Sequence, residues 1–368
     1  MKKFIISITG FVAIMYLTIV GVNYYIDPAN LFHESVIGEM VEKLSANNII
    51  ENPGDIDEGQ FIERYILSLD KAPNLLILGS SRIMYLPWEE VNDDPFIGGL
   101  SGSYLGDYYG VIGVFESSVG LPENIVIGVD PWAFYTDALS GRHTSIAEYA
   151  KYEKELVDTG SSNIEPNVNS NAARKYRELF TFSYFQSSAK SLYTRVRTNG
   201  FEALVDTGDK TVTIAADDSI GDVSKIVPDA RRVMAKEGFF TVTENDDSVN
   251  TMIAQQAIYQ LGSGFSELNT SNIQEFENLI TYLQGKGVNV EFYLPSWYPS
   301  LYDHFCENPN YSGIIKLEEY LRDFSEERGI IVHGSYNPYI CDIHKEDYAD
   351  WLHLKAEKML YNYLYIKE

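Results

Sequence analysis

The sequence predicts an α/β protein with a doubly wound, mostly parallel sheet, a mixed α+β insertion and an apolar helix before the sheet. Four short apolar runs have the length and bounding residues of buried strands, and helical patterns alternate with them. This alternation is typical of βαβ units. At 368 residues, with 45% hydrophobic and 22% charged residues, the chain is long and apolar enough to bury the core that such a sheet needs.

The chain begins with an uncharged apolar run over residues 4–26, preceded by Lys2 and Lys3. A membrane-spanning helix needs about 20 apolar residues, so residues 1–26 are expected to form a transmembrane signal anchor. A buried core helix or a cleaved signal would show a similar run. However, the run exceeds the usual signal-peptide core and no clear A-x-A site follows it. The two lysines before the span, with Asp27 after it, predict a globular body outside the cytoplasm.

The first part of the sheet domain is expected over residues 73–135, after a juxtamembrane connector at 27–72 with a helical end at 63–69. The run 74–78 is continuously apolar, which is typical of a strand buried on both faces. A helix is expected over 104–118 and a second buried strand over 124–129.

The second part of the sheet domain is expected over residues 271–368. A helix over 271–284 opens with capping-box character between Ser271 and Gln274. A third strand covers 288–294. A helix from Ser312 ends before Gly329, and a fourth strand follows at 330–333.

Residues 136–270 break this rhythm and are expected to form an insertion or cap. The stretch contains a polar helix over 143–156 and a further helical portion over 172–197. Between and after these lie a Ser/Asn-rich segment and strand-like pieces at 210–214 and 238–243. No internal repeat is evident.

The formal charge of −25 disfavours nucleic acid as a partner, because neutralising phosphates needs clustered Lys and Arg, and none are evident. It equally disfavours flat adsorption onto anionic lipid. The two cysteines, Cys306 and Cys341, are compatible with a disulfide in a protein outside the cytoplasm. Two small buried thiols are an equal alternative.

Two segments carry the chemistry. The first is Gly79-Ser80-Ser81-Arg82, just past the first strand, and the second is Asp350-Trp351-Leu352-His353-Leu354, expected to open a C-terminal helix. Together they supply a nucleophile (Ser81), a base (His353) and a group that orients the base (Asp350), which is the arrangement of an acyl-transfer triad. Taken alone, the first segment could be a simple turn. The second could be a helix N-cap, Asp350, followed by a surface histidine, His353.

These segments resemble the first and last blocks of the SGNH (GDSL-like) hydrolase superfamily, over residues 73–135 and 271–368. Gly98-Gly99-Leu100-Ser101-Gly102-Ser103 stands at the place of the second block, and Gly128-Val129-Asp130 at the place of the third, G-x-N-D. The resemblance implies an SGNH/flavodoxin-like sheet. With the anchor and the run at 23–28, it points to the membrane-anchored extracytoplasmic branch, which serves D-alanylation of teichoic acid or O-acetylation of exopolysaccharide.

The resemblance also implies roles for neighbouring residues. The third block has a carboxyl group, Asp130, where the family has an amide, so the oxyanion hole is expected to use the backbone N–H groups of Ser81 and Gly102. Asp130 itself either binds substrate or caps a strand. Arg82 has three open roles: an ion pair with Asp130, a contact with an anionic substrate group, or a surface ion pair of little consequence.

All four tryptophans lie close to these blocks: Trp88, Trp132, Trp297 and Trp351. They are expected either to hold sugar rings of the substrate or to pack around the site as core. No metal site is predicted, because an Asp/His group near the C-terminus lacks the compact two-His spacing of zinc hydrolases. That group comprises Asp342, His344, Asp347, Asp350 and His353.

The resemblance thus implies serine-dependent acyl transfer, of an acetyl or D-alanyl group, to or from a cell-surface polysaccharide or teichoic acid. No cofactor is expected. Acyl-CoA is not expected outside the cytoplasm, so an integral-membrane partner would have to supply the acyl donor. Two alternatives remain open: a carbohydrate esterase, and a non-catalytic assembly or scaffold protein that keeps the fold.

Overall fold

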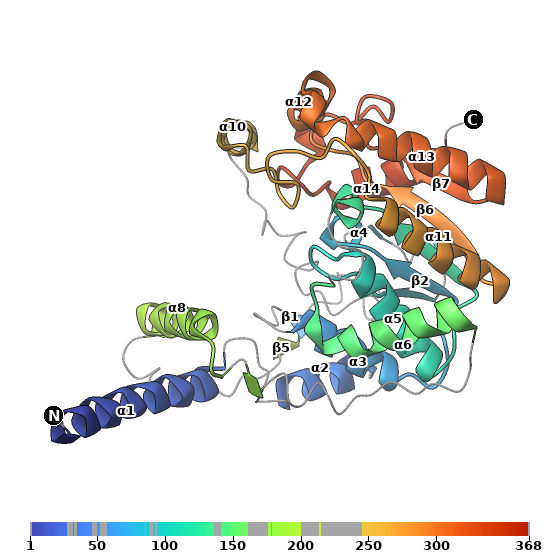
Figure 1. Ribbon diagram of the computed structural model, residues 1–368. Coiled ribbons are helices and arrows are strands. Elements are labelled where there is room, and N and C mark those ends of the chain that lie inside the picture. Colours follow the sequence, from blue (N-terminus) through green and yellow to red (C-terminus); the bar gives the residue numbers. More distant parts are fainter. Residues whose placement is uncertain are drawn as a thin grey trace.

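The computed structural model describes residues 2–27, 32, 35–45, 50–51, 57–84, 86–87, 91–92, 94–135, 141–160, 176–177, 179–199, 213–214 and 245–366 (Figure 1). Its central element is a sheet of five parallel strands in the order β3-β2-β4-β6-β7. The strands are β2 (Leu75–Leu78), β3 (Pro95–Ile97), β4 (Asn124–Gly128), β6 (Asn289–Leu294) and β7 (Ile331–Gly334). The predicted α/β class with a parallel sheet is confirmed.

The strand order reverses between β2 and β4. The chain steps from β2 outward to β3, then returns past β2 to form β4, β6 and β7 in sequence. In open α/β sheets, ligands bind beyond the carboxyl ends of the strands at such a switch point. The gap between the ends of β2 and β4 is therefore the place where a site is expected.

Helices on the sheet explain why the strands are continuous apolar runs. All four residues of β2 are buried. The helices α5 (Leu105–Ser117), α11 (Thr270–Gly285) and α13 (Gly313–Arg328) precede β4, β6 and β7, and right-handed crossovers place all three on one face. The last helix, α14 (Ala356–Leu364), follows β7 and packs against it (Figure 1).

The helix α5 is buried on every side, as its apolar sequence predicts. Its outer side is covered by α6 (Ala147–Thr159), and α3 (Glu58–Leu67) contacts it as well. The helix α6 lies within residues 136–270, the expected insertion. This part of the insertion therefore belongs to the helical layer that covers the sheet.

The expected helices at 104–118, 271–284 and 312–328 are confirmed to within two residues at each end. The expected capping box at Ser271 is wrong, because α11 starts one residue earlier. Its N-cap is Asn269, whose side-chain oxygen accepts from the N–H groups of Ser271 and Asn272. The short amide side chain of Asn satisfies two free N–H groups at once.

The expected helix start at Asp350 is also wrong. Residues 349–352 form bends, Tyr348 and Leu354 pair in an isolated antiparallel bridge, and α14 begins only at Ala356. The Oδ1 atom of Asp350 accepts from the N–H groups of Leu352 and His353, at 2.7 and 2.8 Å. A local side-chain turn of this kind competes with helix and holds the segment as a loop.

The remaining elements include α2 (Ser35–Ser45), α12 (Pro299–Glu307), α8 (Phe182–Asn199) and α10 (Asn245–Gln255). The expected helix at 143–156 is present as a 3-10 turn followed by α6, and α8 covers much of the helical portion expected at 172–197. Two residues of the expected strand at 210–214 form β5 (Thr213–Ile214), which pairs antiparallel with β1 (Ile50–Glu51). The expected strand at 238–243 lies outside the described residues.

At the N-terminus, α1 (Lys2–Ile26) is 25 residues long and carries exposed apolar side chains along most of its length. By length and composition it can span a membrane, and within the described residues it is the single helix that can. Its carboxyl end contacts α8 (Figure 1).

Candidate active site

The turn after β2 places Ser81 at the switch point of the sheet. Gly79 adopts a φ of 149°, and a Cβ there would lie 2.8 Å from Cγ1 of Ile83 and 3.0 Å from the carbonyl oxygen of Gly128. Only glycine fits this close approach of β2, β4 and the short helix α4 (Ser81–Met84). The chain therefore turns sharply at the end of β2 and leaves Ser81 partly exposed at the sheet edge.

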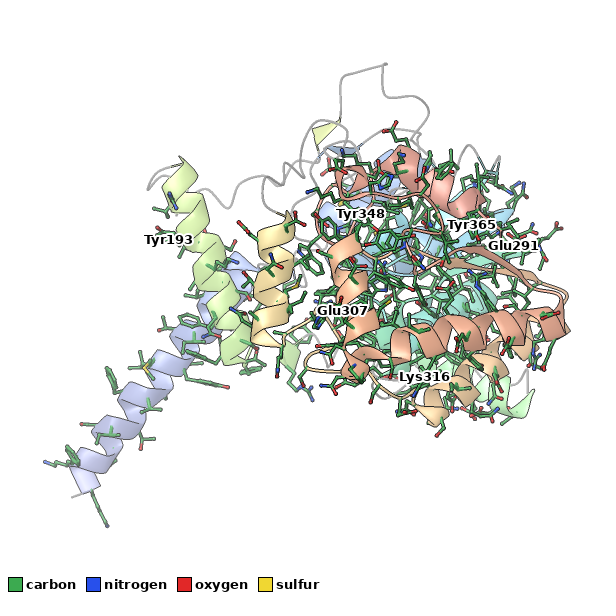
Figure 2. The ribbon with its side chains drawn as sticks, turned by 90° about the horizontal axis from the view of Figure 1, so that it is seen from above. Tyr193, Glu291, Glu307, Lys316, Tyr348 and Tyr365 are labelled. Atoms are coloured by element: carbon green, nitrogen blue, oxygen red, sulfur yellow. The ribbon has the colours of Figure 1, made fainter. Side chains whose placement is uncertain are left out.

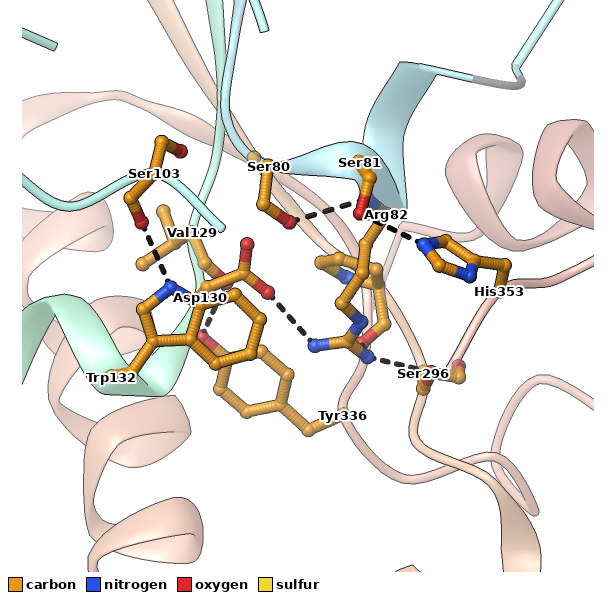
Figure 3. Close-up of polar contacts among 12 residues, drawn as sticks. Ser80, Ser81, Arg82, Ser103, Val129, Asp130, Trp132, Ser296, Tyr336 and His353 are labelled. Carbon is orange, nitrogen blue, oxygen red and sulfur yellow. Dashed lines mark hydrogen bonds and ion pairs between the residues drawn. The ribbon is translucent and has the colours of Figure 1, made fainter. Parts of the chain in front are cut away.

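The structure brings Ser81, His353 and Asp350 into one hydrogen-bonded chain, part of which is drawn in Figure 3. Oγ of Ser81 lies 2.8 Å from Nε2 of His353, and Nδ1 of His353 lies 2.7 Å from Oδ2 of Asp350. Because a carboxylate accepts, Nδ1 carries the proton and Nε2 is left to accept from the Ser81 hydroxyl. This is the tautomer that a general base needs.

The Asp350 carboxylate is held ionised by its surroundings. Burial alone would raise its pKa, but the hydrogen bond and charge of His353 and the N–H groups of Leu352 and His353 outweigh burial and lower the pKa below its usual value. Both carboxylate oxygens are used, one for the local turn and one for the imidazole. The loop at residues 350–353, where a helix start was expected, thus orients the Asp350 carboxylate toward His353.

Behind Ser81, the side chains of Arg82 and Asp130 form a buried ion pair of 2.9 Å, and this is the role among the three considered that the structure contains. Nη2 of Arg82 also donates to the carbonyl oxygens of Pro295 and Ser296, at 2.7 and 2.8 Å. The guanidinium lies 4.1 Å from the ring centroid of Trp297. Arg82 therefore ties together the ends of β2, β4 and β6 (Figure 3).

Asp130 is fully buried in this arrangement. Burial raises the pKa of its carboxyl group, and the neighbouring Arg82 guanidinium opposes that effect. Ser80 is buried beside this pair, and its Oγ accepts from the N–H of Arg82 at 3.2 Å. Ser80 and Ser81 thus face different surroundings, one inside the protein and one at its edge.

The tryptophans divide into two groups. Trp132 and Trp297 are fully buried with ring centroids 6.2 Å apart, and Nε1 of Trp132 donates to the carbonyl oxygen of Ser103 at 2.8 Å. In this conformation no sugar ring can stack on either. Trp351 is partly exposed and contacts Tyr259, which in turn contacts Trp132. Trp88 lies outside the described residues.

Backbone N–H groups are available for an oxyanion at the start of α4. The N–H of Ser81 lies in the first turn, where no carbonyl group of the same helix can accept from it. Because α4 has only four residues, its dipole contributes little to stabilising an oxyanion. Gly102, the second expected donor, is buried with a φ of 60° in the loop after β3, and that loop binds the β2 turn through Leu100 N–H and the Gly79 carbonyl oxygen.

Three residues that sequence reasoning missed surround Gly102: Arg142, Tyr259 and Gln260. A Cβ on Gly102 would lie 2.2 Å from Nη1 of Arg142. That nitrogen donates to the Tyr259 hydroxyl at 3.3 Å, and the Arg142 backbone N–H donates to Asp107 at 2.9 Å. Within the described part of the chain, the exposed Arg142 guanidinium has no carboxylate partner. No spacing in the sequence could have identified it, because its neighbours come from distant segments.

The Asp/His group near the C-terminus does not gather at one point. Asp350 and His353 face Ser81, whereas His344 pairs with Asp342 at the surface. Among the described residues, no group of three or more His, Cys, Asp or Glu side chains converges as a metal site. The two cysteines are free thiols, with Cys306 exposed and Cys341 buried, so the disulfide alternative is not the one found.

Comparison with models of known protein families gives no match for this chain, and a search of curated proteins finds no similar one.

Proposed function

We propose that this protein is a membrane-anchored enzyme of the SGNH type that transfers acyl groups through Ser81, outside the cytoplasm. The observation that carries the proposal is the hydrogen-bonded chain from Ser81 through His353 to Asp350, built from segments 272 residues apart. Nucleophile, base and orienting carboxylate have the geometry and tautomer of an acyl-transfer triad.

The chemistry runs in two steps. The Ser81 hydroxyl attacks the carbonyl carbon of an ester, its proton passes to Nε2 of His353, and the protonated imidazole gives that proton to the departing alkoxide. An acyl group is left on Ser81. In the second step His353 takes a proton from an incoming hydroxyl group, which attacks the acyl-serine. The acyl–Oγ bond then breaks, and the imidazolium returns that proton to Oγ of Ser81.

Negative charge on the tetrahedral oxygen needs donors beside Ser81. The N–H groups of Ser81 and Gly102 are assigned to this role, because Asp130 is committed to Arg82 and offers no amide. Arg82 and Asp130 do not bind substrate in this proposal. They hold the three strand ends from which the nucleophile is presented, so they act as positioning residues.

The substrate class rests on the family resemblance and on the features around the site. An acetyl or D-alanyl group would come from an integral-membrane partner, and the acceptor would be a cell-surface polysaccharide or teichoic acid. The partly exposed Trp351 offers an aromatic face to a sugar, and Arg142 offers a cation to an anionic group at the Gly102 side.

A carbohydrate esterase would use the same residues, with water in place of the acceptor hydroxyl. The non-catalytic scaffold alternative is favoured by one observation, the replacement of the family's amide donor by the buried, paired Asp130. The intact triad geometry favours activity.

Turnover of an activated ester by the full-length protein in detergent tests the proposal. Ser81→Ala and His353→Ala should each abolish release of the acyl group. Ser80→Ala is the matched control, because it also removes a serine hydroxyl, but from the preceding residue, whose side chain is buried. If folded Ser81→Ala keeps full activity, or if the wild type shows none with any ester or polymer tried, the scaffold alternative replaces the enzyme.

The location of the body is tested separately. A reporter that is active only outside the cytoplasm, fused to the C-terminus, should give a signal in cells. Stable expression of the fusion without signal would contradict the extracytoplasmic placement and leave the triad chemistry untouched.

A further inference from the structure

The segment around α8 reverses the charge of the rest of the chain. Residues 172–199 contain six basic residues and one acidic residue, a formal charge of +5, in a protein whose net charge is −25. The basic residues are Arg174, Lys175, Arg177, Lys190, Arg195 and Arg197. The expectation that Lys and Arg are unclustered is therefore wrong for this segment. Of the six, Arg177, Lys190, Arg195 and Arg197 belong to the described part of the chain, and clustered Lys and Arg beside a membrane span are attracted to anionic headgroups.

Residues 179–188 of this segment are attached to the carboxyl-terminal half of α1, and several of their hydrogen bonds meet at Asn23. The side-chain amide of Asn23 donates to the carbonyl oxygens of Leu179 and Thr181, and its oxygen accepts from the Ser188 hydroxyl at 3.0 Å. Leu179, Thr181 and Ser188 all bond to Asn23, and Figure 2 shows α8 crossing α1 and not running along it.

The crossing lies where the span would leave the bilayer. From residue 4 to residue 22, α1 rises roughly 27 Å, close to the thickness of a hydrocarbon core. Asn23 and Asp27 come next, both fully buried, and the Tyr184 hydroxyl donates to Asp27 at 2.6 Å. The polar end of the span is thus covered by α8, at the boundary between lipid and water.

Exposed aromatic side chains lie close to this crossing. Phe182 and Tyr193 of α8 are 65% and 66% exposed, and Figure 2 shows Tyr193 projecting outward from the helix. Phe180 stacks on Tyr16, which lies roughly 10 Å further down α1 than Asn23. That is about the depth to which interfacial helices bury their apolar side chains. Aromatic rings are enriched at this level of membrane proteins.

We infer that residues 176–177 and 179–199 form a second membrane contact, in which α8 lies in the interface with its aromatic residues among the lipids and its basic residues on anionic headgroups. The inference rests on the anchoring role proposed for α1. We assign an anionic phospholipid surface as the partner. The positive charge of the segment, its exposed aromatic residues and its attachment to the end of an apolar span all favour that partner. The acidic remainder of the chain would be repelled by the same surface, so α8 is a local exception.

Fluorescent labelling in lipid nanodiscs tests the inference on the full chain. In a Cys306→Ser background, where the buried Cys341 does not react, an environment-sensitive dye is placed at Phe182→Cys or Tyr193→Cys. In phosphatidylglycerol discs the emission of both labels should shift to the blue and be quenched by spin-labelled lipid. The same dye at Glu319→Cys, an exposed site on α13, is the solvent control.

A label at Ile14→Cys in α1 tests the membrane anchor separately from the lipid contact of α8. If spin-labelled lipid quenches this label but leaves the labels at positions 182 and 193 as unquenched as the control label at position 319, α1 is the anchor and the inference about α8 is wrong. If the Ile14 label is itself unquenched, the anchor proposed for α1 fails. Blue-shifted α8 labels that spin-labelled lipid does not quench would point to a protein contact and overturn the lipid assignment.

The charge contribution is tested by Lys190→Glu combined with Arg197→Glu. This variant should lose the blue shift of the Phe182 label in phosphatidylglycerol discs and keep the weaker shift in phosphatidylcholine discs. Lys316→Glu, an exposed lysine on α13, is the matched charge control and should change neither. Equal shifts in both lipids for the unmodified segment would contradict recognition of anionic headgroups.

Discussion

The guanidinium of Arg82 and the carboxylate of Asp130 lie 2.9 Å apart with side chains 1% and 0% exposed. Arg82 directly follows Ser81, and Asp130 follows the neighbouring strand β4, so the pair joins the two strand ends that flank the switch point. Two further hydrogen bonds from Arg82 reach the end of β6. The position of the nucleophile thus depends on a fully buried pair of charges.

Removing one partner of this pair should be strongly destabilising. Arg82→Ala leaves the Asp130 carboxylate buried without its cation, which typically costs about 3–5 kcal/mol. The double variant Arg82→Ala, Asp130→Ala should be less destabilised than the sum of the two single variants, because neither charge is then left alone. Urea unfolding of the four proteins measures this. Strictly additive losses would contradict the coupling.

Asp350→Asn should keep the loop but favour the wrong tautomer of His353, because an amide can donate to Nδ1. We expect kcat for an activated ester to fall by about 10³ to 10⁴. The fold should be retained, since the amide oxygen can still accept from the N–H groups of Leu352 and His353. Circular dichroism of the variant checks this, and near-normal kcat in a folded variant would argue against the triad.

Asp350 also gives stability a defined dependence on pH. Its pKa is lower in the folded protein than in the unfolded chain, so its ionised form favours folding. That contribution should be fully present above the unfolded pKa, near 4, and lost as the pH falls through the folded pKa. The Asn variant should lack this acid-side loss when thermal unfolding is followed from pH 6 to pH 3.

Arg142 should matter for anionic substrates alone. Arg142→Ala should raise KM for an ester that carries a phosphate or carboxylate group, and leave KM for a neutral ester unchanged, because the triad is untouched. Arg142→Lys should restore part of the affinity, since it keeps the charge but not the planar fork. An equal rise in KM for both esters would show that Arg142 maintains the shape of the Gly102 loop and does not bind the anionic group.

Glu153 of α6 should make the protein less stable at alkaline pH. It is fully buried, and neither carboxylate oxygen has a hydrogen-bond partner among the described residues. Burial, with a contribution from Glu116, raises its pKa from 4.5 to about 8. The folded state therefore binds a proton that the unfolded chain releases, and stability should fall as the pH rises from about 4.5 to 8. Glu153→Gln should unfold at a higher temperature than wild type at pH 9 and match it at pH 5.

The strand pattern was predictable because buried parallel strands are continuous apolar runs, and 74–78, 124–129, 288–294 and 330–333 are all present to within about one residue. The strand β3 was not predicted. It has three residues, begins with a proline and lies at the edge of the sheet, so its pairing with β2 is fixed by tertiary contact and not by local pattern.

The candidate site was predictable only where its residues stand in short local patterns. Ser81 follows a strand, and Asp350 and His353 are three residues apart, so each segment carries a signal. The surroundings of Gly102 carry none, because Arg142 and Tyr259 are 117 residues apart and meet only in the folded chain. The burial of Trp132 and Trp297 was likewise undetermined, since tryptophans pack in cores and at binding surfaces alike.

In the proposed mechanism, Ser81 carries the acyl group between donor and acceptor. The most direct test of this role is the intact mass of the full-length protein, quenched in acid after mixing with an activated ester. We predict the addition of one acyl group, located on Ser81 by fragmentation, absent from Ser81→Ala and retained in Ser80→Ala. An acyl group on another residue, or ester turnover without any acylated Ser81, would contradict it.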